Sequence, residues 1–498
     1  MMTIQASKFT PEVLLSAPRR SSAVPNPSGN RALYTVSSYS FQTHSKTSQI
    51  RVIDVHSGHS TLLYEDGSYS EPTWISDKDI LFFKSGDKGS TSLMLGHSGL
   101  PQVVQEIRNL DGSLSNLKAY RISDEEVAIV CSAPTTLSGA MYRPSAETKA
   151  LSSARTYSTL LWKLPSCPEK AVEEPESIFE KGSIIEARLL PGSGKLLVSS
   201  NSQIESSLFS VLDPSSKKLD YVSSSSKHGK TFGLSEKQLE NFWFKGAEGY
   251  DVQALVVKPS DFDEKKKYPL AFLIHGGPQG AWNDNWSTRW NPAIFAEQGY
   301  IAVMPNPVGS TGYGQNHTDA IQSQWGGLPY VDLVKCFEHI EKKLDYVDID
   351  RAVALGASYG GYMINWIQGN ELGRKFKALV CHDGVFSTLN QWSTEELFFP
   401  LHDFGGPIWE NRATYEKWDP ATKLANWSTP QLVIHNELDY RLPISEGLAM
   451  FNVLQARGVP SRFLMFPDEN HWVLKPENSL VWHKEVLGWI NKYSGVSK

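Results

Sequence analysis

Gly356-Ala-Ser-Tyr-Gly360 is the stretch that decides the fold of this chain, because it places a serine between two glycines directly after an apolar run. The run is Ala-Val-Ala-Leu at residues 352–355, as expected of a strand covered on both faces. From Tyr362 the chain can continue as a helix. A strand that turns sharply into a helix at G-x-S-x-G is a nucleophile elbow, which lifts the serine hydroxyl clear of the sheet. Glycine- and serine-rich chains also produce this pattern by chance, so the residues downstream decide its meaning.

Two residues downstream complete a serine-hydrolase pattern. A serine hydroxyl needs a base, the base needs an orienting carboxylate, and α/β-hydrolases supply them in the order Ser, Asp or Glu, His. Asp439 follows the apolar run at residues 432–435, and His471 follows the next predicted strand at residues 462–466. Both therefore lie in loops at the carboxyl edge of the sheet, where such sheets bind ligands. We predict a triad of Ser358, Asp439 and His471, in preference to a salt-bridged surface aspartate and a solvated histidine.

The loop after the predicted strand at residues 270–274 reads His275-Gly-Gly-Pro-Gln-Gly280. This is the H-G-G type of loop that supplies one backbone donor for a developing oxyanion. The second donor follows the nucleophile directly. We therefore predict an oxyanion hole made of the backbone N–H groups of Gly277 and Tyr359.

Other motifs carry less information. Gly309-Ser-Thr-Gly-Tyr-Gly314 resembles a phosphate loop, but no lysine follows and the Rossmann spacing is absent. His382-Asp383 after a strand could suggest a metal, yet no further ligands cluster nearby, which favours a core or supporting role. None of the four cysteines lies in a C-x-x-C pair. These patterns give no indication of a metal site.

Bulk composition sets the class of protein. With 498 residues, 40% hydrophobic and 20% charged, the chain is globular and long enough for two domains. A net charge of −6 gives no reason to expect a nucleic-acid partner. The start lacks the charged and apolar regions of a signal peptide, and no apolar run approaches the roughly 18 residues of a membrane span. We expect a cytoplasmic protein without membrane association.

The amino-terminal part, residues 20–232, reads as all-β, with short alternating runs separated by Ser, Gly, Asp and Asn clusters. Turn residues precede apolar strands at Ser28, Ser76, Ser123 and Gly192, at intervals of 48, 47 and 69. A period of roughly 45 residues is typical of propeller blades. We predict four to five blades and a surface loop at residues 165–180; a β-sandwich with irregular hairpins is the alternative.

Near Gly233 the pattern changes to buried strands alternating with amphipathic helices, which indicates a doubly wound, mostly parallel sheet. Helices are predicted at residues 332–344 and 445–457, the second stopped by Gly458. The predicted strands cover residues 252–257, 270–274, 301–304, 352–355, 378–380, 432–435 and 462–466. The predicted division is a propeller-like domain at residues 1–235 and an α/β-hydrolase domain at residues 236–498.

From residue 240 to about residue 493 the sequence resembles the catalytic domain of the prolyl oligopeptidase family, in particular its fungal dipeptidyl peptidase V group. The resemblance rests on residues 240–247, 275–282, 286–291, 356–366, 381–386 and 467–474. Ser358, Asp439 and His471 fall on the family's triad positions. The resemblance implies a hydrolase capped by a seven-bladed propeller that removes dipeptides from the amino end of short peptides without a cofactor. Five further residues are predicted to line the substrate pocket: His275, Tyr362, Val385, Phe386 and Arg441.

Two departures from the family pattern affect the expected function. The propeller half is short by two or three blades, with the gap between residues 155–157 and Gly182, and the secreted dipeptidyl peptidase V enzymes carry a signal that this chain does not show. Exposed strand edges would either pair with a second subunit, as a homo-oligomer, or stay partly disordered. An open cap would admit esters and blocked peptides. The alternatives to a peptidase are therefore an esterase or amidase for a small acyl metabolite, and a catalytically silent propeller.

Overall fold

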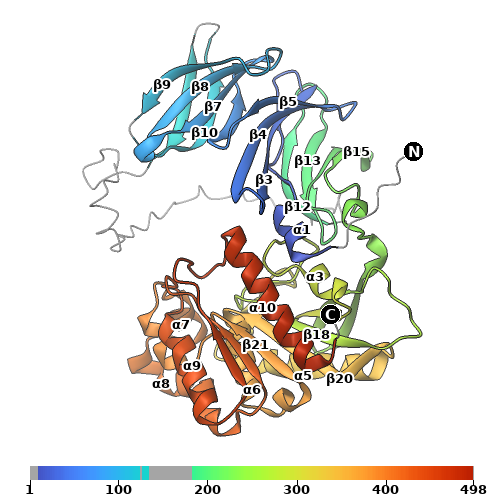
Figure 1. Cartoon of the computed structure of the whole chain (residues 1–498), viewed down its shortest axis with the longest axis vertical. Helices are drawn as coiled ribbons and strands as arrows, with labels where there is room; N and C mark the ends of the chain where they lie inside the picture. The colour runs from blue at the N-terminus through green and yellow to red at the C-terminus, as the bar shows by residue number, and fades with distance from the viewer. Residues whose placement is uncertain (1–8, 111, 124–125, 134–181, 497–498) are drawn as a thin grey trace, which may run out of the picture. The chain divides into compact units, whose positions relative to one another are not determined.

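The computed structural model describes residues 9–110, 112–123, 126–133 and 182–496. It contains two compact units, Met1–Leu15 with Ser226–Lys498, and Ser16–Ser225 (Figure 1). The predicted division at residue 235 differs, because residues 9–15 and 226–235 join the carboxyl-terminal unit. Phe9 supplies the reason: it is fully buried, with its ring 5.3 Å from Phe232 and 5.5 Å from Trp286. The predicted loop at residues 165–180 lies outside the described residues.

The amino-terminal unit is all-β and consists of several small antiparallel sheets. The first contains β1 (Arg19–Arg20), β2 (Val24–Pro25), β3 (Arg31–Ser40), β4 (Ser45–Asp54) and β5 (Ser60–Glu65). The second contains β6 (Tyr69–Trp74), β7 (Asp79–Ser85), β8 (Thr91–His97) and β9 (Val104–Leu110). The third is the pair β10 (Ser115–Arg121) and β11 (Val127–Ser132). The fourth contains β12 (Ser183–Leu189), β13 (Leu196–Asn201), β14 (Leu208–Asp213) and β15 (Lys218–Ser224).

Neighbouring sheets of this unit pack face to face, as propeller blades do. Successive side chains of a strand point to opposite faces. Leu33 of β3 accordingly joins a cluster with Phe82 of the second sheet, whereas Tyr34 joins a cluster with Phe209 of the fourth. The other face of the second sheet buries Phe83 in a third cluster. The first sheet therefore has a neighbour on each face, which explains its two-sided apolar pattern.

The faint sequence repeat coincides with one structural feature. Ser28, Ser76, Ser123 and Gly192 each lie in the hairpin that leads into β3, β7, β11 or β13. In the second of these hairpins the Ser76 hydroxyl donates to the Asp79 carboxylate at 2.8 Å. The period thus reports an equivalent turn in each of the four sheets that the structure describes in this unit.

The carboxyl-terminal unit is built on one eight-stranded sheet, with strand order β16-β17-β19-β18-β20-β21-β22-β23. The pairs β16–β17 and β17–β19 are antiparallel, and all other pairs are parallel. The bounds are β16 (Leu239–Lys245), β17 (Asp251–Val257), β18 (Tyr268–Ile274), β19 (Ile301–Asn306), β20 (Val347–Ala357), β21 (Ala378–His382), β22 (Gln431–Ile434) and β23 (Ser461–Leu464). This confirms the predicted doubly wound, mostly parallel sheet.

Helices cover both faces of this sheet (Figure 1). The helices that the structure describes are α1 (Pro11–Ser16), α3 (Pro292–Glu297), α4 (Gln315–Asp319), α5 (Leu328–Lys343), α6 (Tyr359–Gln368), α7 (Phe398–Asp403), α8 (Ile408–Lys417), α9 (Ile444–Ala456) and α10 (Pro476–Ser494), and those that pack on the sheet include α3, α5, α6, α9 and α10. Helix α5 starts four residues before the predicted position 332, because Pro329 is well suited to a first turn. Helix α9 agrees with the prediction within one residue, and Gly458 beyond it has φ 68°.

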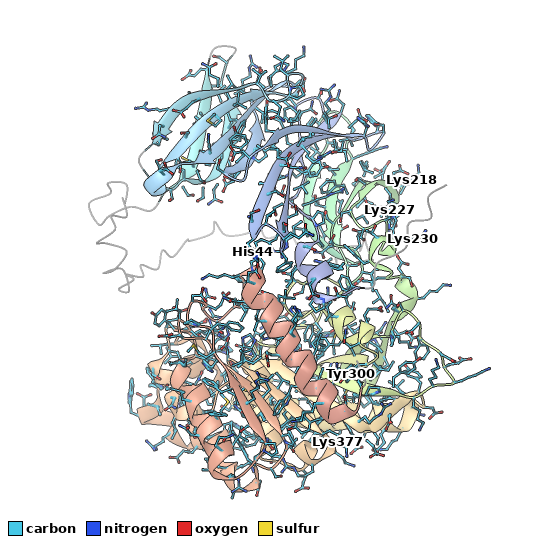
Figure 2. The ribbon with its side chains drawn as sticks, in the orientation of Figure 1. His44, Lys218, Lys227, Lys230, Tyr300 and Lys377 are labelled. Atoms are coloured by element: carbon cyan, nitrogen blue, oxygen red, sulfur yellow. The ribbon has the colours of Figure 1, made fainter. Side chains whose placement is uncertain are left out.

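The main core lies between the sheet and α5, α6 and α9. Leu333, Met363 and Met450 from these helices share one cluster with Ala354 of β20. Val353, which directly precedes Ala354 on β20, is equally buried but points to the opposite face, on which α3 and α10 pack. Tyr300, labelled in Figure 2, anchors the end of α10: its hydroxyl donates to Asn491 at 2.9 Å. Among the helices that the structure describes, none is both long and apolar enough to cross a membrane.

Candidate active site

Ser358 sits on a sharp turn between β20 and α6. Its backbone is left-handed, with φ 59° and ψ −121°, which is a costly conformation for a residue with a side chain. Two hydrogen bonds support the turn: the Ser358 N–H donates to the His382 carbonyl at 3.0 Å, and the Tyr362 N–H donates to the Ser358 carbonyl at 2.9 Å. Side chains at the flanking positions would not fit. A Cβ at Gly356 would overlap the Gly360 carbonyl, and a Cβ at Gly360 would overlap the Ile274 carbonyl.

The His275-Gly-Gly loop runs beside this serine. A Cβ on Gly276 would lie 3.3 Å from the Ser358 Cβ and 3.8 Å from its Oγ, so the bare glycine keeps this space open. Gly277 has φ 126°, a backbone region that favours glycine. Burial lowers the pKa of His275 to about 4, so its ring is neutral. Its Nδ1 donates to the Gly276 carbonyl at 2.7 Å, and its Nε2 lies 2.9 Å from the Ser310 hydroxyl oxygen. His275 therefore holds the loop in place.

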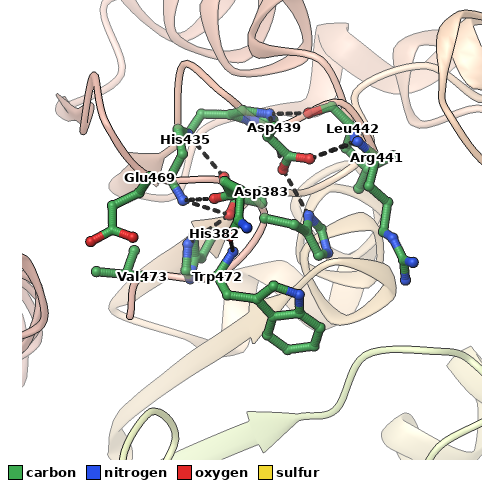
Figure 3. A network of polar contacts seen from close by, with 12 residues as sticks. His382, Asp383, His435, Asp439, Arg441, Leu442, Glu469, Trp472 and Val473 are labelled. Atoms are coloured by element: carbon green, nitrogen blue, oxygen red, sulfur yellow. Dashed lines mark hydrogen bonds and ion pairs between the residues drawn. The ribbon is translucent and has the colours of Figure 1, made fainter. Parts of the chain in front are cut away.

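Asp439, labelled in Figure 3, forms a buried pair with His471. The Nδ1–H of His471 donates to Asp439 Oδ2 at 2.7 Å. The other carboxylate oxygen, Oδ1, accepts the backbone N–H groups of Arg441 and Leu442, each at 2.9 Å. Because Nδ1 carries the proton, Nε2 of the neutral ring keeps a lone pair and can accept a proton.

The Ser358 hydroxyl makes no hydrogen bond to any residue that the structure describes. In serine hydrolases without substrate the contact between nucleophile and base is often long, and it tightens only in the reacting complex. The structure therefore provides a partly exposed serine on a sharp turn and an oriented histidine, both at the carboxyl edge of the same sheet. What it shows as a direct contact is the Asp439–His471 pair.

A second group of residues, which was not predicted from the sequence as part of the site, connects the loops that follow β21, β22 and β23. Asp383, labelled in Figure 3, directly follows β21, and its two carboxylate oxygens accept the backbone and side-chain N–H groups of Asn436, each at 3.1 Å. The same Asn436 amide donates to the Asn470 carbonyl at 2.6 Å, next to His471. The only sequence signal was the position of Asp383 at the end of a strand.

Asp383, His435 and Asp439 each offer an atom within 4.8 Å of the others, which raises the question of a metal. The His435 Nε2 donates to the Leu442 carbonyl at 2.7 Å, so the nitrogen near the carboxylates carries a proton and has no lone pair for an ion. Burial, reinforced by the charge of Asp439, raises the pKa of Asp383 above its usual range. The donor set thus suits a carboxyl group that holds a proton better than it suits a metal ion.

The five predicted pocket residues lie in different environments. Tyr362 is fully buried and donates its hydroxyl to the Trp418 carbonyl at 2.8 Å, which favours a packing role over the predicted contact with substrate. Val385 is also buried, and its carbonyl accepts from Asn365. His275 supports the loop described above. Phe386 is partly exposed.

Arg441 is the fifth of these residues. It is partly exposed and pairs with Glu396 at 2.9 Å. Its backbone N–H, as noted, contacts Asp439. Arg441 and Phe386 therefore remain predicted pocket residues that a ligand can reach.

Comparisons with known proteins place the chain in a class. A family model described as the prolyl oligopeptidase family matches residues 286–497. The probable dipeptidyl-peptidase 5 of Emericella nidulans is 35% identical over 687 residues, covering 99% of this chain and 95% of the relative. The probable dipeptidyl-peptidase 5 of Arthroderma benhamiae is 53% identical over 329 residues, covering 65% of this chain and 45% of the relative.

Solved structures agree on the fold. An acylaminoacyl peptidase in complex with Z-Gly-Gly-Phe-chloromethyl ketone has a TM-score of 0.74 at 16% identity, covering 99% of this chain and 98% of that one. The Pyrococcus horikoshii acylaminoacyl peptidase has a TM-score of 0.74 at 15% identity, covering 98% and 97%. Fold and relatives together define a serine peptidase with an α/β-hydrolase domain and an all-β, propeller-like region. The chain belongs to the prolyl oligopeptidase family.

The alignment with the Emericella nidulans relative runs over 687 positions, whereas this chain has 498 residues. The relative therefore carries internal segments that this chain lacks. The shortening of the propeller half stays a prediction.

Proposed function

We propose that this protein is a serine exopeptidase that removes dipeptides from the amino end of short peptides. The hydrogen bond from His471 Nδ1 to Asp439 is the observation that carries the proposal, because it leaves Nε2 free to act as a base. Ser358 would attack the scissile carbonyl while His471 takes its proton, and the resulting acyl-enzyme would be hydrolysed by water. The dipeptidyl-peptidase 5 relatives support the substrate class.

The developing oxyanion needs donors where the carbonyl oxygen will lie. Tyr359 begins α6 directly after the nucleophile, and its N–H is among the first of the helix, which have no carbonyl partner inside it. Gly277 supplies the second proposed donor from the loop beside Ser358. These two N–H groups and the positive end of α6 would stabilise the negative charge.

A dipeptidyl anilide and a fluorophosphonate probe test this function. We expect turnover of the anilide and labelling of the wild-type enzyme, and Ser358→Ala should abolish the labelling and lower kcat by roughly 10⁴-fold or more. The variant should keep its thermal unfolding midpoint, because the serine hydroxyl has no hydrogen bond to lose. Near-normal turnover by a folded Ser358→Ala variant would remove Ser358 from the mechanism.

An esterase or amidase acting on a small acyl metabolite is the second candidate. The observation that favours it is the missing internal length relative to the Emericella nidulans protein, which a more open cleft would accompany. Comparing a dipeptidyl anilide, an amino-blocked dipeptidyl anilide and a short acyl ester separates the two candidates. Strict preference for a free amino terminus favours the exopeptidase. The cytoplasmic location and the homo-oligomer stay predictions, which cell fractionation and light scattering would test.

A further inference from the structure

Arg289 places a guanidinium without an ion pair over the ring of Trp472, the residue that follows the proposed catalytic histidine. It precedes α3, and its guanidinium carbon lies 3.8 Å from the centroid of the Trp472 ring. Within the part of the chain that the structure describes, this guanidinium makes no hydrogen bond and no ion pair. Its five N–H donors therefore have no acceptor other than water. Burial lowers the pKa of Arg289 to about 10, which leaves the group charged at neutral pH.

The other arginines of the carboxyl-terminal unit show how unusual this is. Each of them donates to a carboxylate or a carbonyl. The pairs are Arg351 with Asp348, Arg374 with Asn426, Arg412 with Glu416, Arg441 with Glu396, Arg457 with Trp427 and Arg462 with Glu485. Lys258 also lies over aromatic rings, but it pairs with Glu240 at 2.5 Å. Among the described arginines of this unit, Arg289 alone combines stacking on an aromatic ring with the absence of an ion pair; Lys417, Lys423 and Lys492 also lie over aromatic rings, but lysine lacks the planar fork of donors.

The position of Arg289 indicates which part of a peptide substrate it can contact. Trp472 follows His471 in the chain, and their rings meet edge to face with centroids 5.6 Å apart. Trp472 is 43% exposed, so its surface is open to a ligand. A catalytic histidine gives its proton to the leaving amine. The groups next to it therefore contact the part of a peptide that leaves, which lies beyond the cleaved bond.

We propose that Arg289 and Trp472 form a subsite for the α-carboxylate of the leaving amino acid or dipeptide. The inference rests on the proposed peptidase function and extends it to a substrate class, namely short peptides with a free carboxyl terminus. Arginine binds carboxylates through two parallel N–H···O bonds, which makes it selective for this planar group. The Trp472 face holds the guanidinium plane and reduces the entropy lost on binding.

Two matched pairs of substrates test the subsite. Each pair consists of a peptide with a free carboxyl terminus and the same peptide as its carboxamide. One residue follows the cleaved bond in the first pair, and two residues follow it in the second pair. We expect the wild-type enzyme to cleave the acid of at least one pair with a kcat/KM about tenfold higher than the carboxamide. A ratio near one in both pairs would overturn the subsite.

Variants then assign the preference to Arg289. Arg289→Met keeps the apolar stem against Trp472 and should bring the acid-to-carboxamide ratio to about one. Arg289→Lys should keep part of the preference for the acid, because lysine retains the positive charge but not the two parallel N–H donors. Arg462→Met, at an exposed ion pair with Glu485, is the control and should keep the wild-type ratio. An unchanged ratio in Arg289→Met would refute the assignment. If no dipeptidyl anilide is cleaved, the proposed function itself fails, whereas anilide turnover with a ratio of one refutes only the subsite.

Discussion

Asn436 binds both carboxylate oxygens of Asp383, one through its backbone N–H and one through its side-chain amide. Because the same amide also reaches the Asn470 carbonyl, this contact joins the loops that follow β21, β22 and β23. The loops after β22 and β23 carry the proposed carboxylate Asp439 and the proposed base His471, and the loop after β21 directly follows His382, whose carbonyl accepts the Ser358 N–H. A single buried residue pair therefore sets how the proposed triad members lie relative to one another.

Replacing Asp383 by asparagine should change how stability depends on pH. Burial, reinforced by nearby Asp439, raises the pKa of Asp383, so the folded protein holds this proton more tightly than the unfolded chain. The stabilisation is complete below the unfolded pKa of about 4 and is lost as pH rises toward the raised folded pKa. Wild type should therefore lose thermal stability more steeply than Asp383→Asn between about pH 4.5 and pH 7.5.

The substitution also weakens the contact with Asn436, which lowers the melting temperature by a similar amount at every pH. Only the slope of the melting temperature against pH tests whether Asp383 titrates. Parallel melting-temperature curves for the two proteins would show that Asp383 does not titrate in this range.

Asp439→Asn should leave the fold intact and abolish most of the activity. The asparagine oxygen can still accept the N–H groups of Arg441 and Leu442, but its amide would face His471 Nδ1 with a second donor. The ring would then adopt the wrong tautomer, and kcat should fall by about 10⁴-fold. Steady-state kinetics and thermal unfolding measure the two effects separately. A loss of less than about tenfold would exclude Asp439 as the orienting carboxylate.

Gly360→Ala should destabilise the elbow, because the new methyl group would overlap the Ile274 carbonyl oxygen, which belongs to backbone. We expect the free energy of unfolding to fall by about 2 kcal/mol or more. Gly488→Ala is the matched control: this glycine lies in α10 with no atom near the added methyl, so alanine should stabilise by about 0.5–1 kcal/mol. Urea unfolding of both variants measures the difference, and equal effects would contradict the steric explanation.

Arg441→Met separates a role in the pocket from a role in stability. The Arg441–Glu396 pair is partly exposed, so its loss should change the free energy of unfolding by less than about 1 kcal/mol. If Arg441 contacts the substrate, as predicted from the sequence, KM for a dipeptidyl anilide should rise. Arg412→Met, which removes an exposed helical pair with Glu416, should affect stability similarly and leave KM unchanged. Identical kinetics in both variants would remove Arg441 from the pocket.

Local features of the sequence were sufficient for much of this structure. Strand, turn and helix at Ser358 follow from an apolar run and two glycines, because neither glycine position has room for a side chain. The loops of Asp439 and His471 follow predicted strands, and parallel strands end at one edge of a sheet. Their meeting at 2.7 Å agrees with that expectation.

Tertiary contacts decided the rest, because the environment of a side chain depends on segments far away in the chain. All residues of α6 are buried, so no periodicity could distinguish Tyr362 in the core from a residue that faces the substrate. Asp383 acquires its partner from a loop 53 residues later. Phe9 joins the carboxyl-terminal unit because its aromatic partners lie there. Arg289 reads as an ordinary surface arginine in the sequence, and only the folded structure shows that its charge lies against Trp472 without an ion pair among the described residues.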